Sequence, residues 1–190
     1  MTAGTLIPLV LLAIVAAYAV VIYNGLVALK HNVAKSLANI DVLLKQRHDE
    51  LPKLVQTCKQ YMQYEQETLE RVINARSSVA SAQQKHDIAA LGSAEGELRA
   101  GLGQLFALAE NYPELKADDT FRQLQQRISG LENAIADRRE IYNEAVNHNN
   151  VRLEQFPDSI VAGLGKFKPF GLLRFSAAEK ADVNIGALFK

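Results

Sequence analysis

The chain has 190 residues, and its 21 lysine and arginine residues balance its 21 aspartate and glutamate residues. Zero net charge argues against nucleic acid as a partner, because nucleic-acid-binding surfaces are usually basic. The single cysteine, Cys58, excludes an intramolecular disulfide and a zinc site built from thiolates, and we interpret it as a small buried apolar residue. Helix formers dominate the composition. The expected fold class is all-α, with an N-terminal transmembrane helix followed by an antiparallel bundle of long helices.

The N-terminal stretch predicts a membrane anchor over residues 1–29. Residues 2–29 carry no charged side chain, and their apolar centre runs from Leu6 to Ile22. About 20 helical residues at 1.5 Å each cross roughly 30 Å of hydrocarbon, so the stretch is long enough to span a bilayer and too long for a typical core helix. Ala17-Tyr18-Ala19 would suit signal-peptide cleavage, but no basic residue precedes the apolar run, which favours a retained anchor.

The flanks of this span predict its orientation and its partners. Lys30 and Lys35 are the first basic residues, and both follow the span, so the positive-inside rule places the N-terminus outside and the bulk of the chain in the cytoplasm. Ala13 and Ala17 are small and four residues apart, a spacing that lets two membrane helices approach closely. We therefore expect a single-pass membrane protein whose partners are the lipid bilayer and further copies of itself. Another membrane protein is a further candidate partner.

An apolar stripe runs along the stretch from Tyr23 to Val79. Its residues recur at steps of three and four, which places them on one face of a helix. They are Leu26, Val33, Leu37, Ile40, Leu44, Leu51, Val55, Cys58, Met62, Leu69, Val72 and Val79. Pro52 interrupts the stretch and leaves two outcomes open: Asp49 caps a new helix and a hairpin forms, or one helix continues with a kink. The stripe keeps its phase across Pro52, which favours continuity.

A further helix is expected from Asp87, as its cap, to Tyr112. Its stripe contains Ile88, Leu91, Leu98, Leu102, Leu105, Ala109 and Tyr112. Four glycines weaken it, each costing up to about 1 kcal/mol against alanine. They are Gly92, Gly96, Gly101 and Gly103. Either neighbouring backbones approach closely at these positions or the segment is frayed.

The last predicted helix begins at Asp118 and Asp119, where acidic side chains suit a helix N-terminus, and ends before Pro157. Its stripe contains Phe121, Leu124, Ile128, Leu131, Ile135, Tyr142, Ala145 and Phe156. Asn149 falls in phase with the stripe, and a polar residue on such a face more often sets register than performs chemistry.

These elements predict a helical bundle over residues 30–157 and a distinct tail over residues 158–190. The tail mixes aromatic and basic residues: Lys166, Phe167, Lys168, Phe170, Arg174 and Phe175. Such a mixture can lie on an anionic membrane surface. We favour the simpler interpretation, in which the phenylalanines pack on the end of the bundle and the charges are solvated, because the tail has no clean helical periodicity.

The sequence offers no catalytic, cofactor-binding or metal-binding residues. None of the four histidines, His31, His48, His86 and His148, belongs to a recognised metal motif. No phosphate-binding loop, dinucleotide fingerprint or nucleophile elbow is present. We therefore expect a protein that is not an enzyme and needs no cofactor.

A series of short motifs lies in order along about residues 20–170. They are Tyr23-Asn24, Leu26-Val27, Ile40-Asp41-Val42, Leu44-Lys45, Arg47, Asp49, Leu51-Pro52, Leu54-Val55, Lys59, Tyr61, Glu65, Thr68-Leu69, Val72, Ala75-Arg76, Ala109-Glu110, Tyr112-Pro113, Leu115-Lys116-Ala117, Phe121, Glu132-Asn133, Ile135-Ala136, Arg138-Arg139, Tyr142-Asn143 and Phe156-Pro157. In this order, they resemble the motifs of the LemA family. The chain departs from the family pattern at Leu37, where tryptophan is usual, and at Asn149-Asn150, where Tyr-Asn is usual. Its tail also lacks the usual acidic C-terminus.

This resemblance implies a single N-terminal span and a bundle of antiparallel helices, and it does not imply an enzyme. One branch of the family is associated with building magnetosome membranes, which motivates our first hypothesis. In it, the chain is a membrane-anchored helical scaffold that organises or remodels a bacterial membrane through self-association or partner binding. The alternative is an adaptor or chaperone-like module that recruits a membrane enzyme, such as a protease, in envelope stress.

Overall fold

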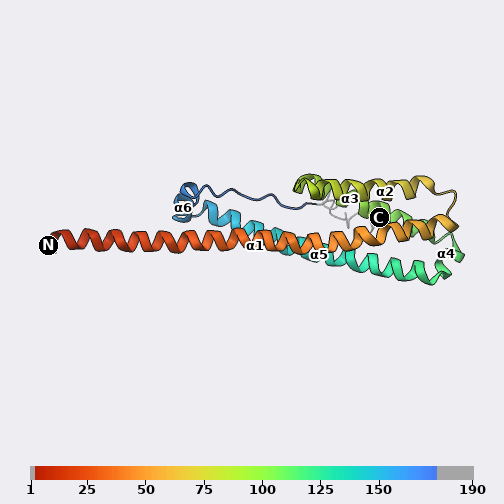
Figure 1. Cartoon of the computed structure of the whole chain (residues 1–190), viewed down its shortest axis with the longest axis horizontal. Coiled ribbons are helices and arrows are strands. Elements are labelled where there is room, and N and C mark those ends of the chain that lie inside the picture. Colours follow the sequence, from red (N-terminus) through yellow and green to blue (C-terminus); the bar gives the residue numbers. More distant parts are fainter. Residues whose placement is uncertain (1–2, 175–190) are drawn as a thin grey trace, which may run out of the picture. The chain divides into compact units, whose positions relative to one another are not determined.

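A computed structural model describes residues 3–174, and this part of the chain is all-α, as expected (Figure 1). Its helices are α1 (Ala3–Tyr61), α2 (Gln66–Gln84), α3 (Ile88–Ala109), α4 (Pro113–Ala117), α5 (Asp119–Glu154) and α6 (Asp158–Leu164). They divide into two compact units. The anchor unit comprises the chain up to Ala38 and Glu140–Gly171, and the bundle unit comprises Asn39–Arg139 and the chain from Leu172. Phe175, part of the predicted tail, lies outside the described residues.

Helix α1 continues through Pro52, which decides between the two outcomes that the sequence left open. A proline removes the backbone donor that would serve the carbonyl four residues earlier, here that of His48. Arg76 of α2 replaces that donor, because its Nε donates a hydrogen bond of 3.0 Å to the His48 carbonyl oxygen. The hairpin turn comes later, between Tyr61 and Gln66.

The bundle unit consists of antiparallel neighbours joined by short turns. Gln83, near the end of α2, donates to Asp41 of α1, whereas Arg76, earlier in α2, donates to His48, later in α1. Later residues of α2 thus contact earlier residues of α1, so the two helices run in opposite directions. Helices α2 and α3 pack along each other (Figure 1). The predicted caps form: the Asp87 side chain accepts from the amide of Ala90, and the Asp118 side chain from that of Phe121.

The predicted stripes supply the bundle core. Buried stripe residues include Ile40, Leu44, Leu51, Val55, Cys58, Met62, Leu69, Val72, Val79, Leu91, Leu98, Leu102, Leu105, Ala109, Phe121, Leu124, Ile128 and Ile135. The side chain of Tyr61, at the end of α1, donates a hydrogen bond of 3.2 Å to Asp118, and this contact ties the start of α5 to the end of α1.

Two glycines of α3 lie where another segment approaches closely. A Cβ on Gly92 would lie 2.1 Å from the carbonyl oxygen of Arg174, and a Cβ on Gly101 would lie 3.4 Å from Val72 of α2. The first distance is impossible for a real side chain, so only glycine fits at position 92 without displacing the backbone at Arg174. Close approach, rather than fraying, therefore explains Gly92, whereas at Gly101 a Cβ would make an ordinary van der Waals contact.

In the anchor unit, the exposure of α1 changes at one point. Large apolar side chains from Ile7 to Val21 are exposed, whereas Ile22 and Leu26 are buried against Ala162 of α6. Leu153, Val161 and Phe167 pack on the same cluster. By length and composition, the N-terminal part of α1 is the one described segment able to cross a membrane.

The end of α5 differs from the sequence-based prediction. Phe156, assigned to the buried stripe, is 83% exposed, because α5 ends at Glu154 and the chain turns before α6. The sequence also gave no indication of α6, which is too short for a periodic pattern. Its packing on Ile22 and Leu26 stabilises it instead.

Candidate functional site

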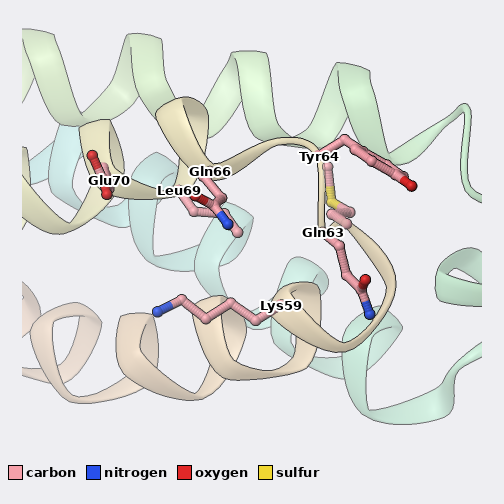
Figure 2. Close-up of a pocket in the computed structure, with 7 residues that line it drawn as sticks. Lys59, Gln63, Tyr64, Gln66, Leu69 and Glu70 are labelled. Carbon is pink, nitrogen blue, oxygen red and sulfur yellow. The ribbon is translucent and has the colours of Figure 1, made fainter.

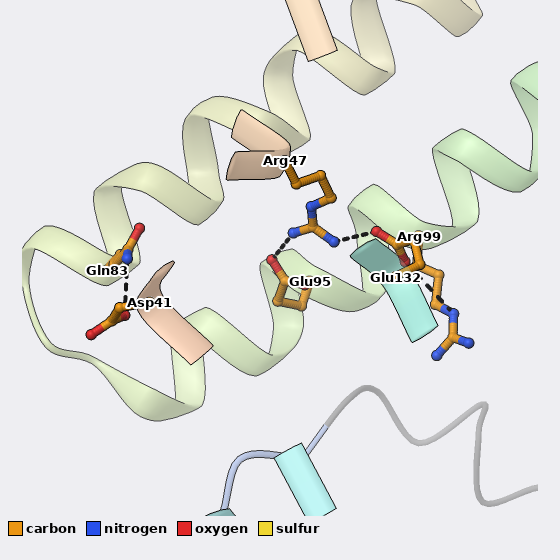
Figure 3. Close-up of polar contacts among 6 residues, drawn as sticks. All are labelled: Asp41, Arg47, Gln83, Glu95, Arg99 and Glu132. Carbon is orange, nitrogen blue, oxygen red and sulfur yellow. Dashed lines mark hydrogen bonds and ion pairs between the residues drawn. The ribbon is translucent and has the colours of Figure 1, made fainter. Parts of the chain in front are cut away.

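The most unusual feature of the bundle unit is an arginine buried among three helices (Figure 3). Arg47 of α1 is 1% exposed. One terminal nitrogen donates to Glu95 of α3 and the other donates to Glu132 of α5. Arg99 of α3 lies 3.9 Å from the second oxygen of Glu132. We call these four residues the ion cluster, and their formal charges sum to zero.

Burial dominates the electrostatics of the ion cluster. It raises the pKa of the Glu95 carboxyl, and the charge and hydrogen bond of Arg47 offset part of that rise. For Arg47, burial works against the charged form, but the two glutamates outweigh it and raise its pKa. Within residues 3–174, the Nε of Arg47 is a buried nitrogen without a hydrogen-bond partner. The cluster is therefore held together by charge pairing against a large desolvation cost.

The ion cluster specifies helix register rather than chemistry. Arg47 is enclosed, both of its terminal nitrogens are engaged by glutamates of the same chain, and its unpartnered Nε is buried, so none of its donors is accessible to a ligand. Only one register of α1 against α3 and α5 lets it reach both carboxylates. Glu50, one turn later on α1, pairs with Arg127 of α5 at 3.2 Å and supports the same register.

A groove between α1 and α2 offers the bundle unit's candidate binding surface. Near the hairpin turn a cavity of about 590 Å³ is lined by residues that include Lys59, Tyr64 and Glu70 (Figure 2). A second hollow of about 400 Å³, which shares Lys59, extends past Pro52 and Ile73. Tyr64 is 94% exposed at the rim. The second hollow is lined mostly by apolar residues, whereas the cavity near the turn is lined mostly by polar ones. An apolar stretch with a polar end suits a protein segment better than a small polar substrate.

The sequence that forms these helices is similar to a known protein family and to several curated proteins. The sequence pattern of the LemA family matches residues 36–186, which is most of the chain. The chain belongs to the LemA family. Among curated relatives, the LemA-family chain is similar to magnetosome proteins MamQ 2 and MamQ 1 of Paramagnetospirillum magneticum (strain AMB-1), each 34% identical over 79 residues. MamQ of Magnetospirillum gryphiswaldense is 32% identical over 79 residues.

These relatives match only part of the LemA-family chain. Each similarity covers 42% of this chain and 29% of the relative. The chain thus accounts for less than a third of the length of the curated relatives it matches. What their names say about magnetosomes is a property of those proteins.

The histidines of this LemA-family chain lie apart. His48 is half-buried on α1, with its ring Nε2 2.6 Å from a terminal nitrogen of Arg76. Burial, followed by the charge of Arg76, lowers the pKa of His48, so the neutral ring accepts this hydrogen bond. His31, His86 and His148 are exposed. Within the described ranges, no three His, Cys, Asp or Glu side chains are placed to hold one metal ion.

Cys58 is fully buried, and burial raises the pKa of its thiol to about 12. At neutral pH the thiol therefore stays protonated and is a poor nucleophile. This placement agrees with its interpretation as a small apolar core residue.

The sequence-based prediction of the core does not include the ion cluster, because it is built on apolar residues alone. The positions of the cluster's charged residues relative to the apolar stripes do indicate that they are buried. Arg47 stands three residues after Leu44, Glu95 stands four after Leu91, and Glu132 stands four after Ile128. All three positions are in phase with buried neighbours, and one positive and two negative residues on three inward faces indicate a buried ion pair network.

Proposed function

We propose that this LemA-family chain is a non-enzymatic, membrane-anchored scaffold that organises or remodels a bacterial membrane through its helical bundle. The observation that carries the proposal is α1. One uninterrupted helix begins with exposed apolar residues, of the kind that hydrocarbon would cover, and ends in a buried bundle core. The same helix thus supplies both an anchor and a framework for α2, α3 and α5.

The interior of the bundle favours a structural role. Its most deeply buried charges, Arg47 and Glu95, are paired with each other, and the buried Glu50 is paired with Arg127. Its buried thiol, Cys58, has a raised pKa. A catalytic site requires reactive groups directed toward a substrate, whereas these groups are directed toward one another or into the apolar core. The similarity to magnetosome proteins supports a role at a membrane.

Orientation is part of the proposal, with the N-terminus outside and the bundle in the cytoplasm, based on Lys30 and Lys35 after the span. A Ser81→Cys variant provides the test, because Ser81 is exposed and the buried Cys58 contributes little background. An impermeant thiol reagent should label this variant only after lysis. Labelling in intact cells would show that the bundle lies outside, opposite to the proposed orientation.

Self-association is expected to involve the span. Ala13 and Ala17 are exposed on α1 and four residues apart. The double variant Ala13→Leu/Ala17→Leu keeps the span apolar but blocks close approach of two helices. We expect an oligomer for the wild type and a smaller species for the variant, by mass photometry in nanodiscs.

The matched control for this test is Val10→Leu/Ile14→Leu, which changes two exposed apolar residues with the same spacing and leaves both alanines in place. It should keep the oligomer. A monomeric wild type would contradict the scaffold, and an unchanged oligomer in the alanine variant would remove this face from the interface.

The groove between α1 and α2 favours a second candidate function, an adaptor that recruits a membrane enzyme such as a protease. Its exposed rim residue Tyr64 is an aromatic side chain of the kind that anchors protein interfaces. A photo-crosslinking residue at Gln56, which lines the groove, distinguishes the two functions in cells. Crosslinks to the chain itself support the scaffold, and crosslinks to one membrane enzyme support the adaptor.

A further inference from the structure

We propose that the anchor unit carries a binding site for the headgroup of an anionic phospholipid, at the point where α1 leaves the membrane. The site is a cleft of about 510 Å³ whose lining includes Tyr23, Lys30, His31, Lys166, Phe167 and Lys168. The inference rests on the proposed membrane anchor and deepens it, because it names the lipid chemistry that the anchor would meet.

The position of the cleft follows from the change in exposure along α1. The run of exposed large aliphatic side chains that begins at Ile7 ends at Val21, and Ile22 and Leu26 are covered by α6 and the segment after it. At 1.5 Å per residue, Tyr23 follows that boundary by roughly 3 Å and Lys30 by roughly 13 Å. Tyr23 would thus lie in the headgroup layer of a spanning helix, and the long side chain of Lys30 can extend back toward that layer.

The segment that closes the cleft is fixed in place by side-chain contacts. The Asn150 side chain accepts a hydrogen bond of 3.0 Å from the backbone amide of Phe170 and donates one of 2.9 Å to its carbonyl. Tyr142 donates a hydrogen bond of 2.9 Å to the Gly171 carbonyl. Arg152 of α5 pairs with the buried Asp158 at the start of α6. The lysines of the segment are therefore carried by an anchored backbone rather than by a free tail.

Ring packing sets one wall of the cleft. The rings of Tyr23 and Phe167 meet edge to face, with centroids 5.6 Å apart. Phe167 also packs on Ile22 and Leu26. These contacts join the segment to α1, so Lys166 and Lys168 on one side face the same cleft as Lys30 on the other. An aromatic wall with a polar rim is typical of side chains at a membrane interface.

The charge of the cleft is complementary to an anion. Lys30, Lys166 and Lys168 contribute three positive charges, and its lining contains no aspartate or glutamate. Across residues 3–174, no ion pair joins any of these lysines to a carboxylate. Neighbouring arginines behave differently, since Arg152 is paired with Asp158. Three lysines that line one cleft without acidic partners suit a phosphate group.

Apolar residues beside the cleft point to a lipid as the source of that phosphate. Phe156, Ile160 and Leu164 are 83%, 56% and 81% exposed on and beside α6, the helix that covers Ile22. A free phosphate ion would gain nothing from them. A phospholipid would gain contact with its acyl chains, because such side chains lie at the boundary between headgroups and hydrocarbon.

Binding of defined lipids to the full chain in detergent tests the site. Phosphatidylglycerol and phosphatidylcholine are titrated separately, and bound lipid is counted by native mass spectrometry. We expect clear preference for phosphatidylglycerol. Each lysine near an anionic headgroup is worth about fivefold in affinity, so Lys166→Gln/Lys168→Gln should lose about 25-fold, and Lys30→Gln alone about fivefold.

The matched control is Lys45→Gln/Lys85→Gln, which removes the same charge from exposed positions of the bundle unit and should keep the preference. The three lysines of the cleft are exposed, so their variants should retain wild-type helicity and melting temperature. Inorganic phosphate at the concentration of the lipid should displace none of it.

Three results would overturn the lipid site: no preference for phosphatidylglycerol in the wild type, the same preference in the Lys166/Lys168 variant, or displacement by inorganic phosphate. The proposed scaffold fails separately. It fails if the wild-type chain leaves membranes in an alkaline wash, whereas the lipid site alone fails if the chain stays in the membrane without lipid preference.

Discussion

The variant Arg47→Met is expected to unfold about 3–5 kcal/mol more easily than the wild type. Removing Arg47 leaves Glu95, which is 2% exposed, without a countercharge in the bundle core. Removing one partner of a buried ion pair typically costs this much, because the remaining charge stays desolvated. Urea denaturation of the full chain in detergent, followed by circular dichroism, measures the difference.

Two further variants separate this effect from a general loss of charge. Arg71→Met removes an arginine whose side chain and whose partner Glu67 are both exposed, and it should cost at most a few tenths of a kcal/mol. Arg47→Met/Glu95→Met removes both buried charges and leaves Glu132 beside Arg99. It should recover most of the lost stability, since apolar replacements of buried pairs are often neutral or stabilising. A double variant as unstable as Arg47→Met would contradict this explanation.

The pH dependence of Arg47→Met follows from Glu95. The pKa of this carboxyl is raised in the folded state, mainly by burial, and loss of Arg47 removes the opposing attraction. The folded state then holds a proton that the unfolded state has already released, so stability falls as pH rises above the ordinary carboxyl pKa. Below that pKa both states are protonated, and the deficit of the variant should shrink.

A second large effect is expected for Leu12→Arg in the anchor. Leu12 lies in the middle of the apolar stretch and is 66% exposed. An arginine at the centre of a spanning helix costs about 2.5–3.5 kcal/mol on insertion, which is about a hundredfold in the insertion equilibrium. After an alkaline wash, the wild type should stay in the membrane pellet and a large fraction of the variant should be released.

Val42→Arg is the matched control for the anchor. Val42 is also an exposed apolar residue of α1, at 57%, but it follows the span by about 20 residues and faces solvent in the bundle unit. Its replacement adds the same charge and should leave the pellet unchanged. Release of the wild type by the wash, or full retention of Leu12→Arg, would show that α1 does not span a bilayer.

Much of the fold was predictable because the stripes are long and regular. The spacing of apolar residues, every three or four positions, was enough to locate the buried faces of α1, α2, α3 and α5. The acidic side chains of Asp87 and Asp118 located the two helix caps. The path of α1 through Pro52 was not predictable, because it depends on Arg76, which is distant in sequence and donates to the carbonyl that proline leaves unpaired. A local sequence pattern contains no information about such a partner.

The candidate sites were harder to predict than the helices. To predict the ion cluster, one must know that three charged residues on three helices meet in one place. That meeting depends on how the three helices pack together. The lipid cleft requires knowing that α6 folds onto Ile22 and Leu26. The sequence groups the basic and aromatic residues after Pro157, but their packing against α1 is a tertiary contact. The seven residues of α6 are too few to show a periodic pattern that would predict it.

The cover that α6 places over Ile22 and Leu26 also sets one edge of the proposed span. Uncharged sequence continues to Leu29, yet tertiary packing withdraws the side chains of Ile22 and Leu26 from any lipid. The apolar surface that the proposed span offers to hydrocarbon on this side therefore ends near Val21. In a thicker bilayer, Ile22 and Leu26 cannot extend the apolar length, so local thinning of the lipid would have to meet the hydrophobic mismatch at this edge.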